Sequence, residues 1–543
     1  MFDFPILTAL VLVPFAGAAI TALMPVRRPE LARVVGYATS VAVAGMTVPL
    51  LTEFVTGSDA TRYQFTESHS WLGALGMRWT LGVDGISLFM VALTALLIPI
   101  GLLASANVGN AKAFTIWMLA LEGAVIGVFA SLDTMMFFIF FEFALVPMYF
   151  LIAGWGHGGR RYAAMKFFLF TMAGSAFLFV GILSVAFMRV AWLGDRGLPD
   201  RLSFDVRVLT DFAANHISGA PAVALFLAFA IGFAVKVPIV PFHTWLPDAH
   251  TDAPTAGSVV LAGVMLKMGA YGFLRFAVPF FPEAAVDLAP VLLVAAVLGI
   301  IYGAIVAAVQ PNLKRIVAYS SVAHLGFVVL GIFAFTRQGM SGAVFTMISH
   351  GLTTGALFLL LGMLYERRHT YEISAYRGIW KAAPVFGGLF VAATFASIGL
   401  PGFSGFVGEF LSMLGAFLTA RWYVVVGSFG VVLAAVYMLW AVQRAFTGEP
   451  DEENAATPDI GARELVTVVP LLGLSLFLGF FPGPVLDRIG PSVDRLVEHV
   501  RIHTDLSVPA VSDVGPAVVT HGETSSGAPA ESDGSDDSGG EHP

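Results

Sequence analysis

Apolar runs of about 20 residues recur along nearly the whole chain and are separated by shorter polar stretches. A transmembrane α-helix needs about that length to cross a bilayer, and it satisfies its own backbone hydrogen bonds in lipid. The alternating pattern of a membrane-spanning β-barrel is not found in these runs. We therefore predict an all-α polytopic membrane protein with about 14 transmembrane helices. The predicted spans are 4–24, 33–52, 84–105, 112–131, 134–153, 165–189, 221–241, 256–277, 288–309, 314–335, 340–364, 384–417, 423–445 and 464–482.

Composition supports this class and narrows the chemistry of the chain. Hydrophobic residues make up 57% and charged residues 12% of the sequence, whereas soluble domains are about 25% charged. The absence of cysteine excludes iron–sulfur ligation, thiolate haem and disulfides in this chain. The first run, 4–24, has no Lys or Arg before it and is followed by Arg27 and Arg28. This order is the reverse of a secretory signal peptide, so we expect the run to remain as a span.

The runs and breaks divide the chain into five predicted regions. They are three N-terminal transmembrane helices in 1–111, a first five-helix repeat in 112–277, a second in 288–445, the last span with an amphipathic end in 446–501, and an acidic tail in 502–543. The tail contains eight Asp and Glu residues and neither Lys nor Arg. Its Gly- and Ser-rich composition predicts disorder, and we assign it no function.

Helix-breaking residues interrupt the fourth span of each five-helix region. In the first region Pro238 and Pro241 follow Lys236, and in the second the stretch 397–405 is rich in glycine and contains a proline. Proline lacks the backbone N–H that a regular helix requires. Because five is odd, two consecutive five-helix regions must have opposite orientations. These features predict an inverted repeat with two discontinuous helices, an arrangement typical of transporters.

The distribution of Lys and Arg predicts the orientation in the membrane. The short loops 25–33, 154–166 and 366–381 are rich in these residues, and the positive-inside rule places such loops on the inner side. With an even number of spans, both termini are then predicted on the outer face.

Six ionisable side chains lie within predicted spans, where a charge at mid-bilayer costs about 2.5–3.5 kcal/mol on insertion scales. They are Glu142, Lys236, Lys267, His324, His350 and Glu409. Ionisable residues inside a membrane usually mark an ion or proton route, and these six can exchange protons if water connects them. A buried pair of Glu142 and Lys236 would act as a switch, because both stay charged when close and the lysine tends to release its proton when they separate.

Structural alternatives remain for these residues. Glu142 could form only a salt bridge, Lys236 could cap the broken helix, and the two histidines could be hydrogen-bonded packing residues. Lys267 is poorly placed to snorkel because it lies at the centre of its run. Glu409 could simply satisfy the second broken helix. It follows Pro401 by eight residues, about 12 Å along a regular helix, so we expect it to face a cavity rather than cap the break.

Several further polar residues are weaker candidates. Three acids, Glu122, Asp133 and Asp248, are placed nearer the ends of spans, where a capping or boundary role is at least as expected as proton transfer. His243 and His250 flank a Trp-Leu-Pro-Asp segment and suggest a metal cluster, but their seven-residue spacing across a proline favours loop structure. We predict no metal or cofactor site in this chain.

Four segments resemble the antiporter-like subunits of respiratory complex I. The most specific is FAVKVPIVPFHTWLPDAHTDAPTAGSVVLAGVMLKMGAYGFLRF at 233–276, and the others are 132–157, 312–327 and 399–410. The likeness extends from about residue 80 to 482. It implies 14 spans in two inverted five-helix halves, with a chain of protonatable residues along the membrane midplane.

The resemblance also implies roles by position. Glu142 matches the acid and Lys236 the lysine of a Lys–Glu pair, Lys267 matches the central relay lysine, and the two histidines match connecting groups. Glu409 matches the terminal group near the outlet. Sister subunits and the related multi-subunit cation/proton antiporters usually have lysine there, so Glu409 favours the M-type subunits. The chain also lacks the long lateral helix and the extra span of the L-type subunits.

The function implied by this resemblance is that of a proton-translocating membrane subunit of NADH:quinone oxidoreductase. No redox centre is expected in this chain, and FMN, iron–sulfur clusters and quinone are expected in other subunits. The expected partners are other membrane subunits, especially the neighbouring antiporter-like ones, and lipid, but not nucleic acid. The expected location is the bacterial inner (plasma) membrane. Two alternatives stay open, namely an Mrp-like cation/proton antiporter subunit and a passive membrane scaffold.

Overall fold

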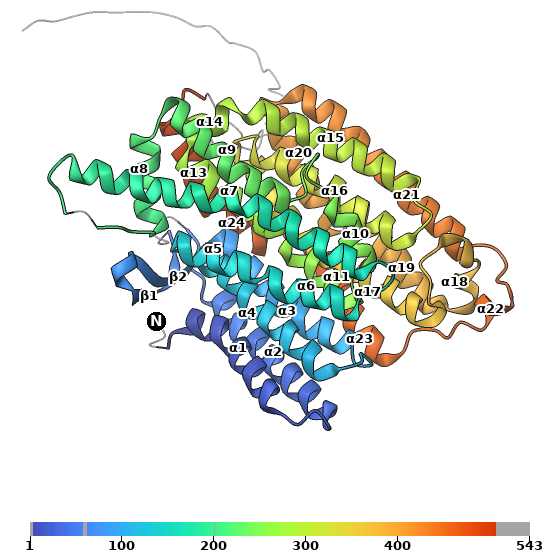
Figure 1. The fold of residues 1–543 in the computed structure, drawn as a ribbon. Coiled ribbons are helices and arrows are strands. Elements are labelled where there is room, and N and C mark those ends of the chain that lie inside the picture. Colours follow the sequence, from blue (N-terminus) through green and yellow to red (C-terminus); the bar gives the residue numbers. More distant parts are fainter. Residues whose placement is uncertain (1–3, 58–61, 200, 507–543) are drawn as a thin grey trace, which may run out of the picture. The chain divides into compact units, whose positions relative to one another are not determined.

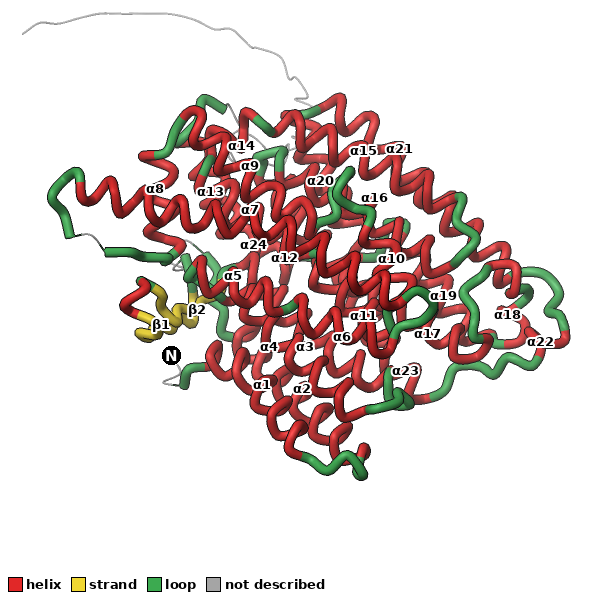
Figure 2. Tube along the Cα trace, in the orientation of Figure 1, coloured by secondary structure: helices red, strands yellow, loops and turns green. Residues whose placement is uncertain are grey.

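A computed structural model describes residues 4–57, 62–199 and 201–506 of the chain. This described part is mostly helical, with one β-hairpin (Figures 1 and 2). The predicted acidic tail comprises residues 502–543. Its residues 507–543 lie outside the described part of the chain.

Thirteen helices in the described residues are long and apolar enough to cross a membrane. They are α1 (Ile6–Leu23), α2 (Pro29–Thr52), α3 (Gly85–Ala104), α4 (Ala111–Ala130), α5 with α6 (Thr134–Phe143 and Leu145–Trp155), α7 (Arg160–Gly194), α9 (Gly219–Lys236), α11–α13 with their intervening turns (Thr255–Phe280), α15 (Ala289–Ala308), α16 (Leu313–Ile332), α17 (Arg337–Arg368), α21 (Arg421–Phe446) and α23 (Ala462–Phe480). The remaining predicted span, 384–417, is divided into two shorter apolar helices, α19 (Pro384–Ser397) and α20 (Ser404–Thr419). The all-α polytopic class is therefore confirmed.

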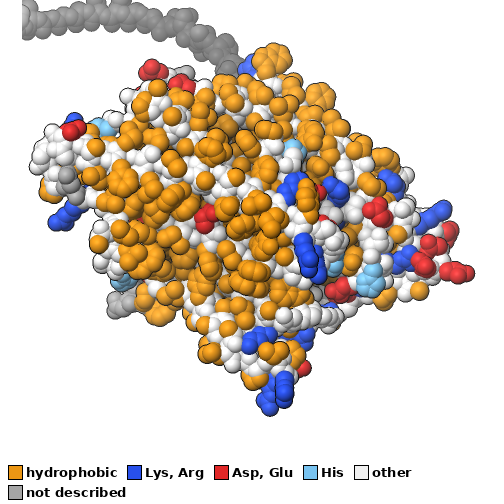
Figure 3. All heavy atoms as spheres, in the orientation of Figure 1, with side chains coloured by type: hydrophobic (Ala, Val, Ile, Leu, Met, Phe, Trp, Pro, Cys, Tyr) orange, Lys and Arg blue, Asp and Glu red, His pale blue; other side chains and the backbone are white. Residues whose placement is uncertain are grey.

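The spanning helices differ in how deeply they are buried. In α11–α13 and in α17, every residue of the most apolar 18-residue window is buried, whereas less than half of that window is buried in α1, α2, α21 and α23. The less buried helices expose many Leu, Val and Phe side chains. On the face drawn in Figure 3, hydrophobic side chains cover most of the surface, and Lys and Arg side chains gather mainly toward its edges. An apolar surface of this kind is suited to contact with lipid. The two fully buried helical spans contain Lys267 and His350, two of the predicted relay residues.

Both predicted helix breaks are present. The helix α9 ends at Lys236, before Pro238, and α10 (Trp245–Asp252) begins after a short turn. The Trp245 indole Nε1 donates a 2.9 Å hydrogen bond to the Val235 carbonyl, because the Ile239 N–H, its partner in a regular helix, donates to the Ala234 carbonyl instead. In the second break, Gly399 and Gly402 adopt φ of 74° and 101°, a left-handed region open to glycine. The inverted relation between the two five-helix regions stays a prediction.

Shorter elements complete the described chain. The polar segment after α2 forms an antiparallel hairpin of β1 (Gln64–Leu72) and β2 (Met77–Val83), which contacts α1 and α5 (Figure 1). The predicted amphipathic end is α24 (Gly483–Ile502), which packs on α3. The remaining short helices are α8 (Val206–His216), α14 (Pro282–Asp287), α18 (Ile379–Ala382) and α22 (Glu452–Ala455).

Candidate functional site

Four of the six predicted relay residues form one buried line. Lys267 Nζ lies 2.8 Å from His350 Nδ1, and His324 Nδ1 lies 2.5 Å from Glu409 Oε1. The two imidazole rings face each other edge to face with their centroids 6.1 Å apart. These side chains come from α12 (Lys267–Gly272), α17, α16 and α20, and all four are buried. The line therefore connects the first five-helix region with the broken helix of the second.

The local helix geometry fixes the position of Lys267. Two π-helical turns, Leu261–Met265 and Phe273–Ala277, flank the α-helical turns that begin at Lys267. A π-turn adds a residue to the helical repeat and leaves a backbone carbonyl without its usual partner. The ammonium group of Lys267 donates to the Ala262 carbonyl, which lies in the first π-turn. These turns were not predicted from the sequence, because they depend on how the helix packs against its neighbours.

Each histidine of the line uses one ring nitrogen and leaves the other unbonded. The Nδ1 atoms contact Lys267 and Glu409. The Nε2 atoms of His324 and His350 are buried without a hydrogen-bond partner among the described residues. An imidazole can accept a proton on one nitrogen and release another from the opposite nitrogen. Each imidazole therefore has one nitrogen in a contact and one that is free, among the described residues, for a second proton partner.

From the sequence, Glu409 is expected to lie well away from the second helix break, facing a cavity. This expectation is wrong, because the Glu409 carboxylate lies beside the break. The helix α20 begins only at Ser404, which places Glu409 in its second turn. While Oε1 contacts His324, Oε2 would lie 3.5 Å from a Cβ atom on Gly399, inside the break. Side chains on a helix point toward its N-terminus, and this brings the carboxylate back to the interrupted backbone.

Glu142 and Lys236 form a separate group on α5 and α9. Lys236 Nζ is buried, lies 4.5 Å from the centroid of the Phe141 ring, and has no hydrogen-bond partner in the described part of the chain. Glu142 is half-buried at the end of α5, where Pro147 interrupts the helix. The two charges interact electrostatically, but within the described residues they do not approach within the 4.0 Å of a direct ion pair. The structure thus places the predicted pair near each other and not in contact.

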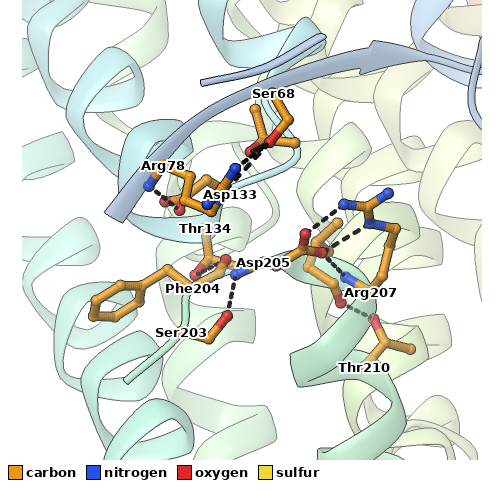
Figure 4. Close-up of polar contacts among 11 residues, drawn as sticks. Ser68, Arg78, Asp133, Thr134, Ser203, Phe204, Asp205, Arg207 and Thr210 are labelled. Carbon is orange, nitrogen blue, oxygen red and sulfur yellow. Dashed lines mark hydrogen bonds and ion pairs between the residues drawn. The ribbon is translucent and has the colours of Figure 1, made fainter. Parts of the chain in front are cut away.

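Asp133 caps a helix, as its position near a span end indicates. Its carboxylate accepts hydrogen bonds from the backbone N–H groups of Met135 and Met136, both at 3.0 Å, and from that of Arg78 on β2, also at 3.0 Å (Figure 4). The neighbouring Thr134 N–H donates to the Phe204 carbonyl. Asp133 therefore joins the start of α5 to the hairpin, a structural role.

Asp248 belongs to a boundary cluster. It lies on α10 and pairs with Lys166 of α7 at 2.7 Å and with Arg315 of α16 at 3.4 Å. Its side chain is 25% exposed, so solvent weakens these pairs. The contacts tie the segment after the first break to two neighbouring helices.

Glu122 is placed differently from the sequence expectation. It lies in the middle of α4 rather than near a span end, and its side chain is fully buried. Neither carboxylate oxygen has a hydrogen-bond partner among the described residues. An ionised carboxylate in such a place is strongly disfavoured, so Glu122 is suited to carry a proton rather than a charge.

His250 is the residue that sequence reasoning most undervalued. It lies on the helix α10 rather than in a loop, is fully buried, and stacks on Phe358 of α17 with ring centroids 4.7 Å apart. Both of its ring nitrogens lack a hydrogen-bond partner within the described ranges. It interacts electrostatically with Lys267 and with Lys314. The signal that could have found it is its helical spacing from the buried Leu246.

The family model described as "NADH:quinone oxidoreductase/Mrp antiporter, TM" matches residues 131–434, more than half of the chain. The chain belongs to this family. All six predicted relay residues fall within the residues that match the NADH:quinone oxidoreductase/Mrp antiporter model.

Curated relatives in this family include proteins named NADH-quinone oxidoreductase subunit M. The one from Rhodobacter capsulatus is 44% identical over 456 residues, covering 83% of this chain and 88% of the relative. The one from Mycobacterium tuberculosis (strain CDC 1551 / Oshkosh) is 38% identical over an alignment of 556 residues, covering 95% and 98%. The expected likeness to M-type subunits is thereby confirmed.

Solved structures share the fold. A chain of "Respiratory complex I from Thermus thermophilus with bound NADH" superposes with a TM-score of 0.81 at 30% identity, covering 91% of this chain and 99% of that one. A chain of the Mrp complex from Dietzia sp. DQ12-45-1b gives a TM-score of 0.76 at 21% identity, covering 91% and 99%. The second likeness concerns the fold alone.

Proposed function

We propose that this chain is a proton-translocating membrane subunit of an NADH:quinone oxidoreductase. The observation that carries the proposal is the buried line from Lys267 through His350 and His324 to Glu409. It offers protonatable groups in direct contact at both ends, in helices that have no other evident reason to bury them. Quinone reduction takes place in other subunits and supplies the energy, since moving one charge against 100 mV costs about 2.3 kcal/mol.

The proton moves along the line by alternating acceptance and release. Lys267 gives a proton to His350 Nδ1, with which it is in contact. The step between the two rings, 6.1 Å apart at their centroids, uses the unbonded Nε2 atoms and a bridging water. His324 then delivers a proton from Nδ1 to Glu409. A change at Glu142 alters the charge that stabilises Lys236 and so starts the transfer toward Lys267.

This role also bears on the cofactors, partners, location and topology of the chain. The chain acts without a redox centre of its own, and FMN, iron–sulfur clusters and quinone belong to other subunits. Its partners are the other membrane subunits, especially the neighbouring antiporter-like ones, and membrane lipid. It lies in the bacterial inner membrane with both termini on the outer face, and its two five-helix regions are inverted repeats.

The deciding test measures protons moved per NADH oxidised by the assembled complex in proteoliposomes. We expect Lys267→Ala to abolish the share of pumping that this chain contributes and Glu409→Gln to lower it, with assembly preserved in both. Lys381→Ala is the matched control, because that lysine is 58% exposed and its ion-pair partner among the described residues, Glu449, is exposed too.

Two outcomes would contradict the proposal. A normal proton-to-electron ratio in assembled Lys267→Ala would favour a passive scaffold. Sodium- or potassium-dependent proton exchange by the complex without NADH would favour a cation/proton antiporter subunit.

A further inference from the structure

A second set of polar residues continues from Lys267 along the same helix. Tyr271 and Arg275 follow at four-residue intervals, so the three side chains lie near one face. Arg275 is eight residues from Lys267, about 12 Å along the axis. It lies in the second π-turn and is only 6% exposed. The relay described above does not use it.

The Arg275 guanidinium is held by three partners. Its Nη2 lies 2.6 Å from Asp84 Oδ1, its Nε donates to the Tyr271 hydroxyl at 3.1 Å, and its Nη1 donates to the Tyr63 hydroxyl at 3.0 Å. The two tyrosine rings lie 5.0 and 5.2 Å from the guanidinium carbon. The Tyr271 hydroxyl donates in turn to the Phe129 carbonyl at 3.2 Å. The cation is therefore fixed in place and cannot swing away.

Asp84 is fixed from the other side. It is the N-cap of α3 and accepts hydrogen bonds from Ile86 N–H and Ser87 N–H. The Arg275 guanidinium and the two N–H groups all interact more favourably with the ionised carboxylate than with the neutral acid. Asp84 therefore stays ionised, and the pair stays charged.

Beyond this pair lies a small cavity of about 20 Å³, enough for one water molecule. Arg62, Arg275 and Arg495 line it together with Asp84 and Ser492, so cations outnumber anions. The amphipathic helix α24 covers this region, because the Ser492 hydroxyl accepts a hydrogen bond from the Gly85 N–H that begins α3. The pair thus lies where the helix that carries Lys267 meets the two ends of the hairpin, the start of α3 and α24.

A buried ion pair is weak evidence for stability, because desolvation offsets most of its attraction and an apolar packing would often serve as well. The position of the Asp84–Arg275 pair offers a reason other than stability for burying it. An arginine stays protonated at any physiological pH, and a fixed cation in a narrow, low-dielectric passage repels protons and other cations.

We propose that the Asp84–Arg275 ion pair, clamped between Tyr63 and Tyr271, is an electrostatic seal that closes the route from Lys267 to the hairpin face. Protons on the relay are thereby directed to Glu409 and do not slip out beside the relay lysine. This inference rests on the proposed proton-transfer function.

The test is the passive proton leak of proteoliposomes that contain the assembled complex, measured after an imposed pH jump without NADH. The main variant is Asp84→Asn with Arg275→Gln, because it removes both charges, leaves no unpaired buried ion and keeps a capping side chain on α3. We expect a several-fold faster leak and fewer protons pumped per NADH, while NADH turnover is retained. Arg275→Lys keeps the positive charge, so vesicles with this variant should leak protons no faster than vesicles with the unaltered complex.

The matched control neutralises a different pair in the same way. Arg368→Gln with Glu453→Gln removes an ion pair between the end of α17 and α22, and the vesicles should stay as tight as those with the unaltered complex. Vesicles with Asp84→Asn/Arg275→Gln that are equally tight would overturn the seal.

Adding Lys267→Ala to the main variant separates the seal from the proposed function. If the leak runs along the relay, this third change should suppress it. A leak that persists would overturn the seal, because the protons would then bypass Lys267. The proposed function is judged independently by NADH-driven pumping of Lys267→Ala alone.

Discussion

His350 lies in the middle of the line, between Lys267 and His324. It is the sole described side chain bonded to Lys267 Nζ, and its ring faces His324. The contrast with Glu142 is informative, since that acid acts on Lys236 through space and not through a hydrogen bond. Glu122 differs again, because it is buried without any partner in the described part. At the residue scale, contact and not burial alone separates the relay from its surroundings.

His350→Gln should block transfer while preserving the fold. Glutamine can still hydrogen-bond to Lys267, but it cannot accept a proton on one atom and release one from another. We expect protons pumped per NADH to fall to the level of Lys267→Ala, with assembly unchanged. His216→Gln is the control, because His216 lies at the end of α8 and stacks on Trp192 away from the line. Normal pumping by His350→Gln would reduce His350 to a packing residue.

At the scale of elements, the helix that carries Lys267 is held by close packing. Gly269 lies against the end of α9, where an added Cβ would meet the Phe233 carbonyl at 2.6 Å and the Val237 side chain at 2.7 Å. The same helix contains both π-turns. A small outward movement of this helix would separate Lys267 from His350, so the packing of α9 against α12 and the geometry of the relay are linked.

Gly269→Ala should therefore impair stability and pumping together. Overpacking of this kind costs about 1–3 kcal/mol, and we expect a lower unfolding temperature of the subunit and fewer protons per NADH. Gly388→Ala on α19 is the matched control, since nothing lies within 4 Å of its added Cβ and alanine favours a helix over glycine. Equal stability of the two variants would show that α12 tolerates the displacement.

At the scale of the whole molecule, the number of membrane crossings sets the orientation. Thirteen helices in the described residues are long and apolar enough to span, and the shorter α19 and α20 correspond to the one further span that the sequence predicts. The two short helices are 14 and 16 residues long, so each spans only part of a bilayer of about 30 Å.

A reporter inserted after Asp505 should accordingly be active on the outer face. An even number of crossings returns the chain to the side on which it began. The measurement is accessibility of the reporter to a membrane-impermeant reagent in intact cells and in inverted vesicles. Labelling from the cytoplasmic side would mean that α19 and α20 do not complete a crossing or that another helix lies along the surface.

The sequence alone determined the membrane class, the approximate spans, both helix breaks and the ionisable residues inside them. These depend on local free energies, namely the transfer of an apolar run into lipid and the missing N–H of a proline. Only the tertiary structure decided which of those residues touch. The Lys267–His350 and His324–Glu409 contacts join residues 83 and 85 positions apart, and the Asp84–Arg275 pair joins two distant helices. The π-turns, the return of Glu409 to the break and the isolation of Glu122 likewise depend on how neighbouring helices pack, which no local pattern in one sequence encodes.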